Sequence, residues 1–186
     1  MEEFYPQKIF EKFDLFLAEQ GLSFKDGVVI GGAAIAMVYG GQRLTRDVDL
    51  LTPIPDVIKR ASIEFATKEG LSQNWLNNRV VNLDSCKPFG WGKDLLPIYL
   101  GKNLSLFTVS RQNLLQIKLF SYCDRPEGLA IDFPDIVLMK PTKDELAKAA
   151  EWIMDQIRKE KRPKTEQDFF AAALADLSKK LQNGIS

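Results

Sequence analysis

The chain has 186 residues, of which 45% are apolar and 27% charged, and its 25 Lys and Arg residues balance its 25 Asp and Glu residues. This composition excludes general disorder and fibrous repeats, and zero net charge argues against a dedicated nucleic-acid coat. The chain contains no histidine, which excludes Ser-His and Cys-His triads and histidine-based zinc sites.

The first two thirds of the chain predict alternating helices and strands, from helical spacing of apolar residues, β-branched runs and polar–apolar alternation. The expected elements are, in order, a helix over 6–20, a strand over 28–30, a helix over 33–39, a strand over 47–51 and a helix over 56–69. Gly31 and Gly32 are expected to form the turn between the first strand and the second helix.

Residues 71–103 carry weaker signals. The expected elements there are a short helix at Trp75 and Leu76, a strand over 80–83, a loop over 87–93 and a hairpin of strands 95–100 and 104–109 across residues 101–103.

The last third predicts helices, joined by a basic linker over 158–164. They are a helix over 111–123 after Ser110 as N-cap, one from Asp132, one over 143–157 after Thr142 and one over 165–182. The last helix carries an apolar stripe, which either packs on the core of its own domain or forms a partner seam. The stripe consists of Phe170, Leu174, Leu177 and Leu181. We therefore expect an α/β (α+β) core over 1–140 and a helical extension over 141–186.

Cysteine usage and the N-terminus bear on location. Cys86 and Cys123 form no CxxC pair, so we expect free thiols and a cytoplasmic protein. The acidic start of the chain lacks the apolar segment of a secretory signal, and the longest uncharged run, 27–42, is short and broken by glycines. We expect no membrane partner, and we find no DNA-specific motif.

Asp47 and Asp49 form the first group of residues suited to chemistry. Period-two alternation places both carboxylates on one strand face, where they suit a hard cation such as Mg²⁺. Gly31 and Gly32 open a helix, so backbone N–H groups there can approach a phosphate. Asp-x-Asp alone is a weak motif, so the interpretation depends on the order strand, Gly-Gly, helix, Asp-x-Asp strand.

That joint pattern, GGAAIAMVYGGQRLTRDVDLL from Gly31 to Leu51, resembles the nucleotidyltransferase superfamily with the polymerase-β-like core. The RLTRDVD segment is similar to the bacterial branch that includes abortive-infection toxin nucleotidyltransferases and uncharacterised relatives. Residues 107–138 also resemble that branch, with a helix-borne Lys, a following Arg and Asp-x-x-Asp-Ile, as does LSQNWLN over 71–77. The resemblance touches most of residues 27–140.

The resemblance implies a nucleotidyltransferase-like mixed sheet and transfer of a nucleotidyl group from an NTP to an acceptor hydroxyl, with Mg²⁺ or Mn²⁺ as cofactor. It makes Asp47 and Asp49 the metal ligands, with Lys118 as a third catalytic candidate. The candidate nucleotide-binding residues are Gly31, Gly32, Arg43, Thr45, Arg46, Asp132 and Asp135.

Several of these residues have a plainer interpretation as well. Lys118 either neutralises phosphate charge or is a solvated lysine on an amphipathic helix. Asp132 and Asp135 either orient Lys118 or bind a nucleoside, or else they serve as N-cap and first-turn acid of the helix that starts there.

The residues around the Asp pair also have alternatives. Arg43 and Arg46 either grip phosphates or pair with the carboxylates, and Thr45 either lies on a strand face or orients an Asp. Trp75 and Trp91 either stack on a base or belong to the core.

The sequence departs from the family pattern at two positions, and these departures bear on whether the protein is an active enzyme or an inactive module. Ala33 stands where many members have a phosphate-binding Ser, and the strand over 104–109 carries no third carboxylate. Asp84 and Asp94 are the only acids between residues 70 and 110. The first hypothesis is an active enzyme with an RNA, protein or small-molecule acceptor, in a toxin–antitoxin or phage-defence setting.

The second hypothesis is an inactive module of the same fold that acts by binding nucleotide or a protein, such as a cognate antitoxin or a second copy. A third and weaker one is a sugar-nucleotide glycosyltransferase that uses Asp-x-Asp as its metal site.

Overall fold

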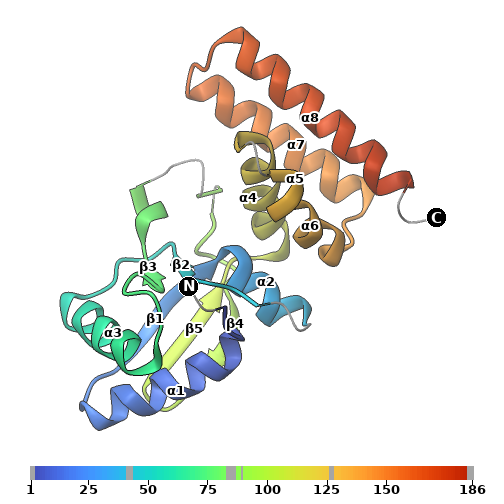
Figure 1. Cartoon of the computed structure of the whole chain (residues 1–186). Helices are drawn as coiled ribbons and strands as arrows, with labels where there is room; N and C mark the ends of the chain where they lie inside the picture. Colours follow the sequence, from blue (N-terminus) through green and yellow to red (C-terminus); the bar gives the residue numbers. More distant parts are fainter. Residues whose placement is uncertain (1–2, 41–43, 83–86, 89, 126–127, 184–186) are drawn as a thin grey trace. The chain divides into compact units, whose positions relative to one another are not determined.

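The computed structural model describes residues 3–40, 44–82, 87–88, 90–125 and 128–183. The chain divides into two compact units, Met1–Ser110 and Arg111–Ser186, which we call the N-terminal and the C-terminal unit and describe one at a time (Figure 1). The division lies at residue 110 because the helices that follow pack on one another. The units therefore do not coincide with the expected core of 1–140 and extension of 141–186.

The N-terminal unit is mixed α/β, as the sequence predicts. Its elements are α1 (Pro6–Glu19), β1 (Phe24–Ile30), α2 (Gly31–Tyr39), β2 (Val48–Leu50), α3 (Asp56–Glu69), β3 (Leu76–Asn77), the 3-10 helix η1 (Arg79–Asn82), β4 (Leu96–Leu100) and β5 (Leu104–Thr108).

The five strands form one mixed sheet in the order β3-β2-β1-β5-β4. The central strand, β1, is antiparallel to β2 and parallel to β5. At the two edges, β3 runs parallel to β2 and β4 antiparallel to β5, so the expected hairpin across residues 101–103 is confirmed. Pro97 in the edge strand β4 has no N–H to offer another strand, which protects this edge from pairing.

An aromatic cluster forms the core between α1, α3 and the start of β3. The rings of Phe13 and Phe65 lie 5.2 Å and 5.5 Å from the ring of Trp75, which is fully buried. The indole Nε1 of Trp75 donates to the Ser62 carbonyl at 3.0 Å, which satisfies its polar atom. Trp75 is therefore a core residue, and no base can stack on it.

Two expectations for this region are wrong. Residues around Trp75 and Leu76 form a turn and strand β3 rather than a short helix, and most of the expected strand over 80–83 is the helix η1. The Val48 N–H donates to the Trp75 carbonyl, so pairing with β2 determines the conformation of this segment. Such tertiary pairing overrides local propensity.

The C-terminal unit is helical, as expected. Its elements are α4 (Arg111–Asp124), α5 (Gly128–Ile131), α6 (Phe133–Met139), α7 (Lys143–Lys159) and α8 (Lys164–Asn183). Thr142 and Glu145 form a capping box at the start of α7, and α7 and α8 pack side by side as a helical hairpin (Figure 1). The short helix α5 was not predicted.

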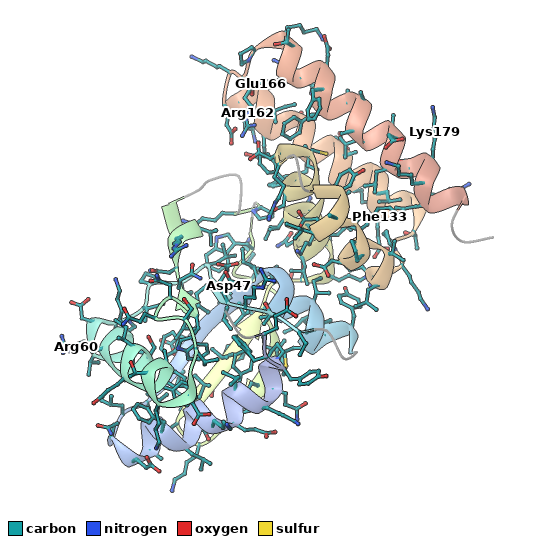
Figure 2. The ribbon with its side chains drawn as sticks, viewed as in Figure 1. Asp47, Arg60, Phe133, Arg162, Glu166 and Lys179 are labelled. Atoms are coloured by element: carbon teal, nitrogen blue, oxygen red, sulfur yellow. The ribbon has the colours of Figure 1, made fainter. Side chains whose placement is uncertain are left out.

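The apolar stripe of α8 is buried inside this unit. Phe170 is 2% exposed and its ring lies 5.6 Å from that of Phe120 on α4. Arg162 lies in the α7–α8 turn (Figure 2). Its guanidinium covers both rings at 5.4 Å and 5.3 Å and pairs with Asp124 at 2.5 Å. The stripe therefore packs on the core of its own unit. No helix among the described residues is both long and apolar enough to cross a membrane.

Candidate functional site

Gly31 and Asp49 lie next to each other at the end of the central strand. Ile30, the last residue of β1, pairs with Asp49 on β2, which brings the carboxylate beside the next residue, Gly31. Gly31 has φ +71°, and a Cβ added there would lie 3.2 Å from Asp49 Oδ2. Both the left-handed backbone and the close carboxylate favour glycine at this position. The structure thus brings together two predicted site residues.

The N-terminus of α2 is suited to an anion. Gly31 and Gly32 are its first residues rather than a separate turn, and Ile30 at the N-cap makes no side-chain hydrogen bond to the helix. The first turn contains no acidic residue. The first N–H groups of a helix have no partner within the helix, and the helix dipole favours negative charge there. This end of α2 therefore favours an anion, and phosphate binding there stays a prediction.

Thr45 fixes the backbone that leads to the Asp pair. Its backbone forms an isolated bridge with Phe4, and its hydroxyl donates to the Asp47 carbonyl at 3.0 Å. Thr45 is 8% exposed, so a nucleotide has little access to it. Asp47 itself is exposed and precedes β2, which begins at Val48 (Figure 2). Of the two interpretations of Thr45, the structure favours orientation of Asp47.

Arg46 pairs with Glu3, with 3.1 Å between its Nη2 and Glu3 Oε1. Both side chains are largely exposed, and such a surface pair is worth about 0–1 kcal/mol, so a phosphate can replace Glu3 at little cost. Arg43 lies outside the described residues, so its phosphate-binding role stays a prediction. Trp91 is half-buried, and base stacking on it also stays a prediction.

Asn77 is a site residue that the sequence analysis missed. It pairs with Asp49 across the parallel strands β2 and β3, and paired residues of neighbouring strands point to the same face of a sheet. Its Oδ1 accepts the Arg79 N–H at 3.2 Å, and the residue is 8% exposed. A two-residue strand carries no periodic signal, so nothing in the sequence pattern pointed to this position.

The structure describes only one of the two candidates for a third carboxylate, so the role of Asp84 stays a prediction. Asp94 is exposed in the segment before β4, and Asp84 lies outside the described residues. Within the described part of the chain, no three His, Cys, Asp or Glu side chains gather as a potential metal site. On β3, the residue that pairs with Asp49 is Asn77, whose side chain is an amide rather than a carboxylate.

A second group of charged residues is buried in the C-terminal unit. Lys118 Nζ on α4 lies 2.9 Å from Asp132 Oδ1 and 2.7 Å from Asp135 Oδ2. Both Asp side chains are fully buried and the Lys118 side chain is 6% exposed. Arg125 adds a second cation, with its Nε 3.1 Å from Asp132 Oδ2. We call these four residues the Lys118 cluster.

The cluster decides between the alternatives for its members. The solvated-lysine interpretation of Lys118 is wrong because the ammonium is buried between two carboxylates. Asp132 is the N-cap residue of α6 and Asp135 lies in its first turn, as expected, but the Asp132 side chain makes no capping hydrogen bond. Two cations balance two anions, which is how proteins accommodate buried charge. The arrangement supports the interpretation in which Asp132 and Asp135 orient Lys118.

Cys123 is not a candidate nucleophile. It is buried on α4, and burial, followed by the charge of Asp124, raises the pKa of its thiol to about 12. The thiolate is the reactive form of cysteine, so this thiol is unreactive at neutral pH. Cys86 lies outside the described residues.

Comparison with known proteins gives one weak structural likeness. No known family model matches the chain, and no curated protein matches it. Among solved structures, the chain is similar to an antigenic nucleotidyltransferase-like protein from Paracoccidioides brasiliensis, with a TM-score of 0.44 and 15% identity over 94% of this chain and 95% of that one. A likeness at this level assigns no activity.

Proposed function

We propose that the chain is a nucleotidyltransferase that uses Mg²⁺ or Mn²⁺ to move a nucleotidyl group from an NTP to an acceptor hydroxyl. The observation that carries the proposal is the position of Asp49 beside Gly31 at the start of α2. A phosphate held by the first turn of α2 lies next to this carboxylate. The resemblance of residues 31–51 to the superfamily supports the same chemistry.

Asp47 and Asp49 are the residues that would hold the metal ion. Mg²⁺ is commonly bound by one or two carboxylates together with substrate phosphates and water, so a two-carboxylate site fits it. The ion supplies charge neutralisation for the reacting phosphates. Gly31 and Gly32 bind the triphosphate through backbone N–H groups, and Thr45 holds the Asp47 backbone in position.

The alternative is an inactive module of the same fold that binds a nucleotide or a partner protein. Asn77 favours it, because an amide beside Asp49 cannot take a proton from an acceptor hydroxyl as a carboxylate does. Both candidates share the nucleotide site and differ in turnover. In either case we propose a toxin–antitoxin or phage-defence setting, on the family resemblance alone, with an antitoxin or a second copy as partner.

A thermal-shift panel tests the shared site. ATP, GTP, CTP and UTP are each added with and without Mg²⁺ to the wild type and to the double variant Asp47→Asn/Asp49→Asn. A ligand that binds only the folded protein raises its melting temperature. We expect a Mg²⁺-dependent rise for at least one nucleotide in the wild type and none in the variant, whose melting temperature without ligand stays close to that of the wild type.

Three other outcomes are informative. A variant that unfolds makes the Asp pair structural, and a wild type that responds to no nucleotide removes the nucleotide site. Nucleotide binding without release of pyrophosphate, when RNA, protein and small-molecule acceptors are supplied, favours the inactive module.

A further inference from the structure

The N-terminal unit contains a cavity that the proposed donor site leaves unused. It has a volume of about 430 Å³ and lies between the start of β1, the segment before β4, and β5. Its lining residues are Lys25, Asp26, Gly92, Lys93, Leu95 and Phe107. A second cavity of about 410 Å³ also borders Lys25 and Asp26. Volumes of this size suit a small organic ligand.

The cavity and Asp49 lie on the same face of the sheet. Phe107 pairs with Val28 and Asp49 pairs with Ile30, and residues two apart on one strand point to one face. Phe107 and Asp49 are separated by two residues along β1 and two strand spacings across it, or about 12 Å. A molecule held against Phe107 therefore lies on the face of the sheet that carries Asp49.

The lining combines cations with an aromatic ring. Lys25 Nζ donates to the carbonyls of Gly101 and Lys102 at 2.9 Å and 2.6 Å, which fixes the ammonium at the β4–β5 turn. An ammonium has three donors, so two carbonyls do not exhaust it. Lys93 adds a second cation. Phe107 is half-buried in the sheet and offers a ring face held in place by the strand.

The β4–β5 turn itself is held rigidly. The Asp14 carboxylate on α1 accepts the backbone N–H groups of Lys102, Asn103 and Leu104 at 3.2 Å, 2.6 Å and 2.5 Å. The Lys25 ammonium is thus bound to a turn with a fixed conformation. A preformed cation costs less to order on binding than a free side chain.

We infer that this cavity binds a ribonucleotide as the acceptor substrate, an inference that rests on the proposed function. A fixed cation beside an aromatic ring is how proteins hold single-stranded nucleic acid, by phosphate contact and base stacking. The donor triphosphate already has Gly31 and Gly32, so the two ammonium groups that line this cavity serve a second anion. Asp26 can accept a ribose hydroxyl, whereas the two lysines disfavour a cationic acceptor.

The test uses the full chain and two probes, fluorescein-labelled single-stranded penta-adenylate and unlabelled adenosine 5′-monophosphate as competitor. We expect the oligonucleotide to bind and AMP to displace it. Phe107→Leu should raise the dissociation constant at least about fivefold without changing its salt dependence. Lys93→Gln should lower the slope of log affinity against log salt by about one unit.

Matched controls separate these effects from general ones. Lys59→Gln removes the same charge from the exposed face of α3, and Phe169→Leu removes an exposed ring from α8. Both should bind the oligonucleotide like the wild type. All four variants should keep the Mg²⁺-dependent nucleotide response, and Asp47→Asn/Asp49→Asn should lose that response but keep the oligonucleotide.

The outcomes distinguish the two proposals. If neither probe binds, or if Phe107→Leu and Lys93→Gln bind like the wild type, the ribonucleotide pocket is wrong while the donor site can stand. If the two variants weaken NTP binding instead, the cavity belongs to the donor nucleotide and the inference is overturned. If the oligonucleotide binds but AMP does not displace it, the cavity does not hold a single ribonucleotide and the inference is overturned. If the probes bind as expected and no NTP does, only the proposed function fails.

Discussion

At Gly31, one residue combines a backbone requirement with a steric one. Its φ of +71° costs a side-chain-bearing residue roughly 1–2 kcal/mol, and an added Cβ would meet Asp49 Oδ2 at 3.2 Å. We expect Gly31→Ala to lower the free energy of unfolding by about 1–2 kcal/mol and to abolish the Mg²⁺-dependent nucleotide response. Urea unfolding and thermal shift measure the two effects.

Gly21→Ala is the control for this prediction. Gly21 also has positive φ, +64°, but nothing lies within 4 Å of the added Cβ. It should show a comparable loss of stability and normal nucleotide binding. Equal loss of binding in both variants would show that general destabilisation, rather than contact with Asp49, weakens the site.

The Lys118 cluster makes a different prediction at the residue scale. Lys118→Met leaves two fully buried carboxylates without their shared cation, and breaking a buried ion pair in this way costs about 3–5 kcal/mol. We expect a loss of that size in urea unfolding. A variant as stable as the wild type would contradict the burial of this charge.

A triple variant, Lys118→Met with Asp132→Asn and Asp135→Asn, separates structure from function. Removing all three charges leaves no buried unpaired ion, so most of the stability should return. If Lys118 also binds phosphate, the triple variant folds but loses affinity for NTP. If the cluster is purely structural, the triple variant binds NTP normally.

At the scale of elements, sequence signals predicted helices well where their ends are locally encoded. Thr142 and Glu145 form the capping box that marks the start of α7. Gly70, in the left-handed conformation, ends α3 after Glu69, as expected from its position. In both cases the information lies within a few residues of the helix end.

The site was partly predictable for the same reason. Gly31 and Asp49 are joined by α2 alone, between the antiparallel strands β1 and β2. Their spacing in the sequence therefore indicates that they lie close together. Asn77 enters the site through a two-residue strand that only pairing with β2 creates. The burial of Lys118 depends on how α4 and α6 pack, because a helical lysine has the same sequence pattern whether it is solvated or paired. The position of Asn77 and the burial of Lys118 therefore depend on long-range pairing and packing, which local sequence patterns do not show.

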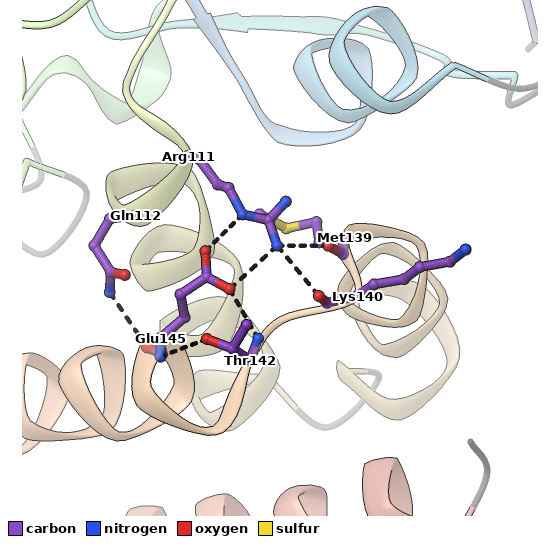
Figure 3. A network of polar contacts seen from close by, with 6 residues as sticks. All are labelled: Arg111, Gln112, Met139, Lys140, Thr142 and Glu145. Carbon is purple, nitrogen blue, oxygen red and sulfur yellow. Dashed lines mark hydrogen bonds and ion pairs between the residues drawn. The ribbon is translucent and has the colours of Figure 1, made fainter. Parts of the chain in front are cut away.

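The junction of α4, α6 and α7 shows what such packing achieves. Arg111 donates to both Glu145 carboxylate oxygens, at 2.6 Å and 3.2 Å, and to the carbonyl of Met139 at 2.8 Å (Figure 3). The Thr142 N–H donates to Glu145 as well, at 2.8 Å. One ion pair thereby joins the start of α4, the end of α6 and the N-cap of α7.

This junction predicts a pH dependence. The hydrogen bonds from Arg111, and then from the Thr142 backbone, lower the pKa of Glu145 from 4.5 to about 2. A carboxyl with a depressed pKa in the folded state stabilises above its unfolded pKa, and this stabilisation is lost as pH falls through the folded value. We expect Glu145→Gln to lose about 1 kcal/mol at neutral pH, because solvent screens a partly exposed pair.

The pH range identifies the cause. The difference between wild type and Glu145→Gln should shrink between pH 4.5 and about 2, measured by urea unfolding at a series of pH values. Asp144→Asn removes the same charge from the first turn of α7 and controls for the helix dipole. A difference that stays constant with pH would assign the effect to shape rather than ionisation.

At the scale of the whole molecule, each unit has a core of its own. In the N-terminal unit, Phe13, Phe65 and Trp75 pack between helices and sheet, and in the C-terminal unit Phe120 and Phe170 pack between α4 and α8. The apolar stripe of α8 belongs to the second core. The boundary at residue 110 therefore separates the Gly31–Asp49 site from the Lys118 cluster, and any joint action requires both units.

Separate cores predict separate unfolding. Phe65→Ala and Phe170→Ala each create a cavity in one unit only, at a cost of about 3–5 kcal/mol. Hydrogen exchange resolves local opening of this kind. We expect Phe65→Ala to accelerate exchange in α1, α3 and the sheet while α4, α7 and α8 keep wild-type protection, and Phe170→Ala to show the reverse. Equal acceleration in both units by either variant would mean that the chain unfolds as a single cooperative structure, and the binding tests on the two sites would then have to be interpreted together.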